Sequence, residues 1–140
     1  MTKKQKKLTT IISISVVVLM YLITNFIRPK LMEIKFNKYN KEFMEIYSEL
    51  INSIDIKNLD TALTEENFIK VDQLGELVPK MEDLQTEKTF FKFVSSRNFY
   101  LDIKNSLEKA KYWNTMTDTE KFEIQTILIS NKSVVNLSSN

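Results

Sequence analysis

The side chains in this sequence that could do acid–base chemistry are carboxylates, lysines, tyrosines and hydroxyls. The chain has no His and no Cys, which excludes imidazole bases, thiolate nucleophiles, disulfides and the standard zinc sets. A single glycine, Gly75, excludes a glycine-rich phosphate loop. Two carboxylate pairs remain, Glu82 with Asp83 and Glu45 with Glu49, and each would need burial to separate its pKa values. Because charged pairs are ordinary on helix surfaces, we predict that the chain is not an enzyme and takes no cofactor.

The charge is distributed unevenly along the chain. Residues 1–30 contain six cations and no acid, while the other 14 basic and all 18 acidic residues follow, leaving that part at −4. The cations near the N-terminus flank an apolar run, as they do beside membrane-spanning helices. These cations account for the sequence pI near 8.7. No spacing of acids resembles a calcium-binding loop. We therefore predict neither a nucleic-acid partner nor a metal.

Twenty residues from Leu8 to Ile27 carry no charge. A helix of that length is about 30 Å long, which matches the hydrocarbon core of a bilayer. A core helix of a soluble protein seldom has every face apolar with lysines gathered at one end. We predict a transmembrane helix over residues 8–27, with flanking cations at Lys3, Lys4, Lys6, Lys7, Arg28 and Lys30.

This helix is expected to remain as a signal anchor. A removable signal usually has a shorter apolar region followed by small residues, and residues 24–27 include no Ala or Gly. Cleavage stays the alternative. Residues 1–7 are predicted to form a basic cytoplasmic tail, because a short tail rich in lysine is costly to translocate whereas a long domain is not. The bulk of the chain would then lie outside the cytoplasm. The abundance of Ile, Lys and Asn favours a bacterial source.

Residues 28–56 have the pattern of an amphipathic juxtamembrane helix. Apolar side chains recur at spacings of three and four, which places them on one stripe of the helix. Pro29 lacks an N–H and is expected to kink the chain at the membrane surface. We predict that the stripe contributes to an assembly seam; its members are Phe36, Tyr39, Phe43, Ile46 and Leu50.

The remainder of the helical domain is predicted over residues 57–131. Thr64 can cap a helix that ends near Leu74, with Gly75 as its C-terminal cap and Pro79 starting another short helix. The sequence TDTE, residues 117–120, fits a capping box for a last helix that ends near Asn131. Residues 132–140 are polar and small, so a flexible tail is expected there.

Aromatic residues alternate with cations between Lys88 and Trp113. Such a pattern can mean stacking on single-stranded nucleic acid or contact with anionic lipid, but aromatic residues more often fill a core. Phe90, Phe91 and Phe93 are retained as interaction candidates. Because β-propensity is high there, an irregular or strand segment near residues 88–95 stays open.

These patterns predict an all-α protein, with one transmembrane helix followed by a small bundle of about four helices. With no catalytic or ligand motif, the expected function is that of an anchored interaction or assembly module outside the cytoplasm, serving as an accessory subunit of a membrane-associated complex. Its partners would be the membrane and another protein or its own copies. The alternative is a secreted or anchored helical domain, of a phage or plasmid type, that binds a ligand or inhibits another protein.

Overall fold

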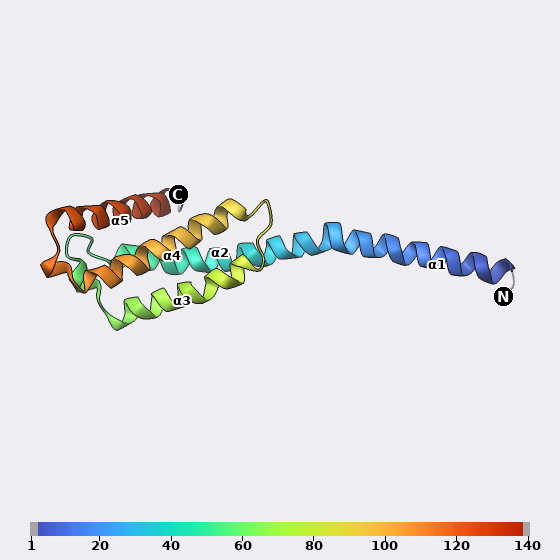
Figure 1. Cartoon of the computed structure of the whole chain (residues 1–140), viewed down its shortest axis with the longest axis horizontal. Helices are drawn as coiled ribbons and strands as arrows, with labels where there is room; N and C mark the ends of the chain where they lie inside the picture. The colour runs from blue at the N-terminus through green and yellow to red at the C-terminus, as the bar shows by residue number, and fades with distance from the viewer. Residues whose placement is uncertain (1–2, 139–140) are drawn as a thin grey trace.

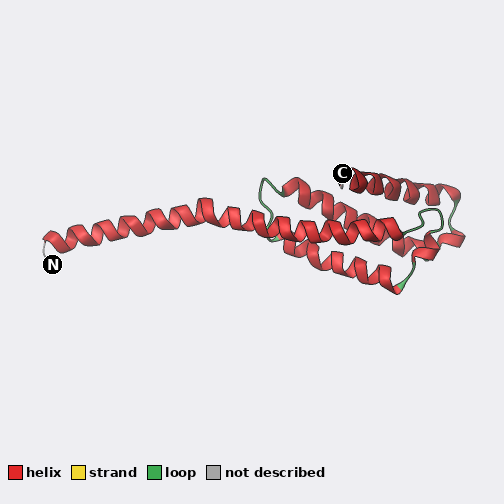
Figure 2. Ribbon diagram, turned by 180° about the vertical axis from the view of Figure 1, so that it is seen from behind, coloured by secondary structure: helices red, strands yellow, loops and turns green. Residues whose placement is uncertain are grey.

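The computed structural model describes the backbone of residues 3–138 and side chains from Ile12 to Leu137. A long N-terminal helix leads into a four-helix bundle, and no strand occurs within the described range, which confirms the predicted fold class (Figures 1 and 2). The helices are α1 (Lys3–Leu22), α2 (Arg28–Ser53), α3 (Glu65–Glu82), α4 (Phe90–Ala110) and α5 (Asp118–Ser138), with a π-helical segment at Ile23–Ile27 and 3₁₀ turns at Leu59–Ala62 and Trp113–Thr115.

The long helix continues through Pro29 without a break. The π-helical segment Ile23–Ile27 joins α1 to α2, and the N–H of Arg28 donates to the carbonyl of Ile23. Pro29, directly after that segment, has no N–H to donate inside the continuous helix, and a π-helical turn is a local adjustment that accommodates such a gap. The expected kink is therefore replaced by a change of helical register, and Figure 1 shows only a gentle bend.

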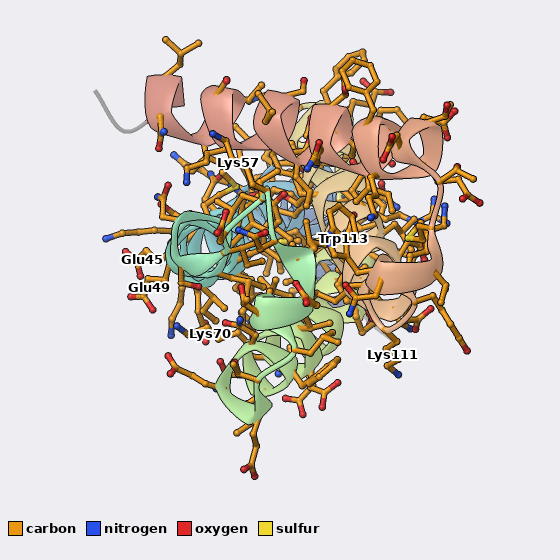
Figure 3. The ribbon with its side chains drawn as sticks, turned by 90° about the vertical axis from the view of Figure 1, so that its left-hand side faces the viewer. Glu45, Glu49, Lys57, Lys70, Lys111 and Trp113 are labelled. Carbon is orange, nitrogen blue, oxygen red and sulfur yellow. The ribbon has the colours of Figure 1, made fainter. Side chains whose placement is uncertain are left out.

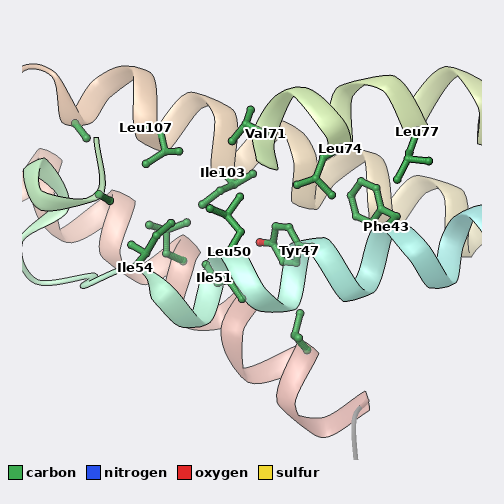
Figure 4. Close-up of a cluster of buried hydrophobic side chains, with 14 of the residues drawn as sticks. Phe43, Tyr47, Leu50, Ile51, Ile54, Val71, Leu74, Leu77, Ile103 and Leu107 are labelled. Carbon is green, nitrogen blue, oxygen red and sulfur yellow. The ribbon is translucent and has the colours of Figure 1, made fainter. Parts of the chain in front are cut away.

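The four bundle helices alternate in direction. Helix α2 runs away from α1, α3 returns, α4 runs outward again and α5 comes back (Figure 1). The core lies between them and contains residues from every bundle helix, including Leu50, Leu74, Ile103 and Leu128, each fully buried (Figure 4). Because α1, the π-helical segment and α2 form one continuous helix, the apolar N-terminal segment leads directly into this core.

The helix break expected at Gly75 does not occur, because α3 continues through this residue. It runs unbroken from Glu65 to Glu82, with Thr64 capping it as predicted by accepting the N–H of Asn67 at 3.2 Å. Gly75 has a helical backbone and no positive φ. Its role is steric, since a Cβ there would lie 2.9 Å from the hydroxyl oxygen of Tyr100 on α4. Pro79 lies inside α3 and starts no new helix.

The strand alternative for residues 88–95 is wrong, because helix α4 begins at Phe90. A turn precedes it, in which the hydroxyl of Thr89 accepts the N–H of Thr86 at 2.8 Å. Phe93 is buried in the core, and the hydroxyl of Ser96 donates to the side-chain oxygen of Asn40 on α2 at 2.9 Å. These tertiary contacts outweigh the local β-propensity.

Helix α5 begins as predicted and ends later than predicted. In its capping box the N–H of Thr117 donates to a carboxylate oxygen of Glu120 at 2.8 Å, and the Thr117 hydroxyl accepts the N–H of Glu120 at 3.3 Å. The Thr117 N–H, together with the Thr117 hydroxyl that donates to the same carboxylate oxygen at 2.8 Å, lowers the pKa of Glu120. The helix continues past Asn131 to Ser138 because Val135 is buried, so residues 132–138 are not a flexible tail. Residues 139 and 140 lie outside the described range.

Candidate interaction surface

The carboxylates considered for catalysis are all exposed to solvent. Glu45 lies 3.7 Å from the amine of Lys41, and Glu49 lies 3.9 Å from that of Lys70 on α3 (Figure 3). Glu82 and Asp83 are exposed at the C-terminal end of α3. Exposed ion pairs of this kind contribute little to stability, and none of the four carboxylates has the buried surroundings that acid–base chemistry requires.

The apolar stripe of α2 packs mainly into the chain's own core. Phe36, Phe43 and Leu50 are fully buried, while Tyr39 and Ile46 are half-buried and pack against the same cluster (Figure 4). Sequence spacing identified an apolar face correctly but could not tell what covers it. Since α3, α4 and α5 already cover it, this stripe is not a surface on which a partner could bind the folded bundle.

A small polar cluster sits beside this core. The side-chain amide of Asn131 on α5 donates to a carboxylate oxygen of Asp102 on α4 at 2.9 Å. The buried hydroxyl of Tyr47 on α2 lies near both but meets no hydrogen-bonding geometry among the described residues. Burial is the main cause that raises the Tyr47 pKa, the Asn131 amide opposes it, and the Asp102 carboxylate adds to it. The cluster links three helices and is too enclosed to serve as a binding site.

The aromatic segment divides between core and surface. Phe93 and Trp113 are buried, whereas Phe91 is 79% exposed and Phe90 49% exposed. Part of its cation content is used inside the fold, since the amine of Lys111 lies 5.8 Å from the ring centre of Phe68 on α3. The aromatic and basic residues of the segment therefore do not form one continuous exposed face. One exposed aromatic pair remains at the start of α4.

The apolar N-terminal helix is exposed over its described side chains. Every described side chain from Ile12 to Arg28 is exposed, and most of them are large and apolar. The described residues contain one helix long and apolar enough to cross a membrane. Arg28 and Lys30 are exposed at its end, as a flanking role requires; the side chains of Lys3, Lys4, Lys6 and Lys7 lie outside those described.

Two polar side chains near the end of this helix are satisfied by the helix itself. The hydroxyl of Thr24 donates to the carbonyl of Met20 at 2.9 Å, and the amide of Asn25 donates to the carbonyl of Tyr21 at 2.9 Å. In hydrocarbon no water can serve such groups, so internal bonding is what a membrane segment needs. Local π-helical adjustment next to a proline serves the same end.

The outward face of α5 is a surface that the sequence reasoning did not single out. Helix α5 packs on α2 and α4, and it lies on the opposite side of the bundle from α3 (Figure 3). From Ile124 to Ser138 its only charged residue is Lys132. The exposed apolar side chains, here called the α5 outer face, are Phe122, Ile127, Ile129, Val134 and Leu137.

A signal for this face is present in the sequence. The buried residues Ile124, Leu128 and Val135 form one stripe at helical spacing, and apolar residues also occur between the members of that stripe. A helix that is apolar on more than its core-facing side needs a second cover. Comparisons of the chain with protein-family models, curated proteins and solved structures found no match.

Proposed function

We propose that this chain is a single-pass, membrane-anchored assembly module whose helical bundle lies outside the cytoplasm and binds a second copy through the α5 outer face. The observation that carries the proposal is an apolar helix, exposed along its described length, that continues directly into the bundle core. An accessory role in a membrane-associated complex would follow from such an anchored, self-associating unit. No catalytic chemistry, cofactor, metal or nucleic acid is part of the proposal.

Lipid is the proposed cover for the apolar helix. In water, a run of exposed Ile, Val, Leu and Met side chains of this length would carry a large hydrophobic cost. Thr24 and Asn25 bond to their own backbone, and Arg28 and Lys30 mark one boundary. Orientation rests on the short lysine-rich N-terminus, which is costly to translocate, against a bundle that is mildly acidic.

A second copy is the proposed occupant of the α5 outer face because the face offers apolar contact with little charge. Two identical charged faces would repel one another, whereas the charged residues of α5 from Phe122 onward are only Glu123 and Lys132. Helix α5 has 21 residues and is therefore about 30 Å long, so one helix-to-helix contact would fall at the small end of interface sizes, below about 1,200 Å². Anchoring in one membrane sets both bundles at the same height and raises their effective concentration.

Disulfide crosslinking through single cysteines tests this proposal, and the chain has no native Cys to interfere. Thr126 is exposed among the residues of the α5 outer face, so the Thr126→Cys protein in native membranes is expected to form a crosslinked dimer under mild oxidation. Thr61→Cys, exposed at the turn before α3, is the matched control and should stay monomeric. A Thr126→Cys protein that stays monomeric, or a Thr61→Cys protein that crosslinks equally well, would rule out the α5 contact between copies.

A further inference from the structure

The connection between α3 and α4 lies at the end of the bundle nearest the apolar helix (Figure 1). The amine of Lys88 lies 3.9 Å from a carboxylate oxygen of Glu33 on α2. Six residues of helix separate Glu33 from Ile27, so this connection lies about 9 Å beyond the end of the apolar run. The headgroup layer is about 5–7 Å thick on each side of a bilayer, so for an upright helix the connection lies about 2–4 Å beyond its outer boundary.

Two exposed phenylalanines follow this connection at once. Phe90 and Phe91 occupy the first two positions of α4, and their ring centres are 5.7 Å apart in an edge-to-face arrangement. Helix α4 runs away from the apolar helix, and side chains of an α-helix lean toward its N-terminus. The pair therefore leans toward the side where the membrane would be. The bundle leaves much of the pair uncovered, since Phe91 is 79% exposed and Phe90 is 49% exposed.

A cleft of about 690 Å³ separates the connection from the apolar helix. Its wall on the apolar helix includes Phe26 and Pro29, and its wall on the connection includes Thr86 and Lys88. Asn25, Lys30 and Glu33 also line the helix side, so the cleft is apolar only at Phe26 and Pro29 and is otherwise polar, as expected at the headgroup level. The cations at its rim are balanced, because Lys30 and Lys88 are accompanied by Glu33 and Glu87.

We infer that the connection between α3 and α4, with Phe90 and Phe91 at the start of α4, is a second membrane contact that rests on the interface of the bilayer holding the anchor. The inference depends on the anchor proposed above and adds a contact of the bundle itself. Phe is among the apolar side chains with which surface helices enter the boundary between headgroups and acyl chains, and a helix tilt of about 20°, the average for transmembrane helices, would bring the pair toward it. Because the positive and negative side chains at the rim of the cleft balance, we expect contact with uncharged lipid. Anionic headgroups are not needed.

Electron paramagnetic resonance of the full chain in phosphatidylcholine vesicles tests the inference. Nitroxide labels would be attached to single cysteines at Phe91, at Tyr112 and at Val18, and their collisions with oxygen and with a water-soluble nickel chelate compared. Tyr112 is the matched control, an exposed aromatic residue just beyond the opposite end of α4. The ratio of oxygen to nickel collisions should be highest at residue 18, intermediate at 91 and lowest at 112.

The outcomes separate this inference from the anchor. A residue 91 label as open to nickel as the residue 112 label, with residue 18 shielded, would overturn the second contact and leave the anchor standing. A residue 18 label open to nickel would overturn both. Spin–spin broadening between residue 91 labels would mean contact between copies in place of lipid, and would also overturn the inference.

A second labelled protein keeps both aromatic rings. A nitroxide at Glu87, which is exposed in the same connection, should be partly shielded from nickel. Adding Phe90→Ser and Phe91→Ser should shift it to the value found at residue 112. An unchanged Glu87 value in that variant would show that the phenylalanines do not hold the connection at the membrane.

Discussion

Replacing Phe43 by Ala is expected to lower the free energy of unfolding by about 3–5 kcal/mol. Phe43 is fully buried, packs with Tyr47 at a ring-centre distance of 6.1 Å, and belongs to the cluster that joins α2 to the rest of the core (Figure 4). Domains of ordinary size have only about 5–15 kcal/mol of stability in total, so this loss is large. Denaturant unfolding in detergent, followed by fluorescence of the single and buried Trp113, would measure it.

Phe122→Ala is the control that separates core from surface. Phe122 is 68% exposed on the α5 outer face, so the free energy of unfolding should change by no more than about 0.5 kcal/mol. The same substitution should weaken the Thr126→Cys crosslink. If Phe43→Ala left stability unchanged and instead abolished self-association, the α2 stripe would be an interface, as its spacing alone first indicated.

Placing two charges in the apolar helix is expected to release the chain from the membrane. Val17→Lys together with Met20→Lys introduces two lysines, and each costs about 2.5–3.5 kcal/mol at the centre of a membrane helix. Both native residues are exposed along the apolar run, so neither substitution disturbs the packing of the bundle. Alkaline washing of membranes, followed by detection of the chain in the pellet and supernatant, would show the release.

The control for this experiment adds the same charge elsewhere. Asn52→Lys with Ser95→Lys places two lysines on exposed positions of α2 and α4, and this protein should stay in the pellet. A Val17→Lys, Met20→Lys chain that also stays in the pellet would mean that something other than the apolar helix holds the protein to the membrane.

Features governed by nearby residues were predictable from the sequence. The uncharged run that ends at Ile27 is set by composition alone, and the caps at Thr64 and Thr117 depend on side chains that bond within three residues. Local rules also explain why the helical stripe of α2 was found. Those rules do not show which segment packs against the stripe. Phe36, Phe43 and Leu50 were therefore assigned to a seam between molecules, whereas the structure places them in the core.

The missed features depend on contacts between distant segments. Gly75 matches a helix C-cap by residue type, but its place inside α3 follows from the approach of Tyr100, which lies 25 positions away in the sequence. The start of α4 at Phe90 depends on burial of Phe93, and the extension of α5 depends on burial of Val135. The α5 outer face emerged only once the core-facing side of that helix was known.

Thiol labelling in intact cells tests the central claim, a membrane-anchored bundle outside the cytoplasm, most directly. One protein would carry Thr2→Cys and another Asn136→Cys, an exposed position on α5, in a chain that has no other cysteine. A membrane-impermeant maleimide is expected to label residue 136 in intact cells, and residue 2 only after lysis, with both proteins in the membrane fraction. Labelling of residue 2 in intact cells while residue 136 stays protected until lysis would contradict the proposed topology.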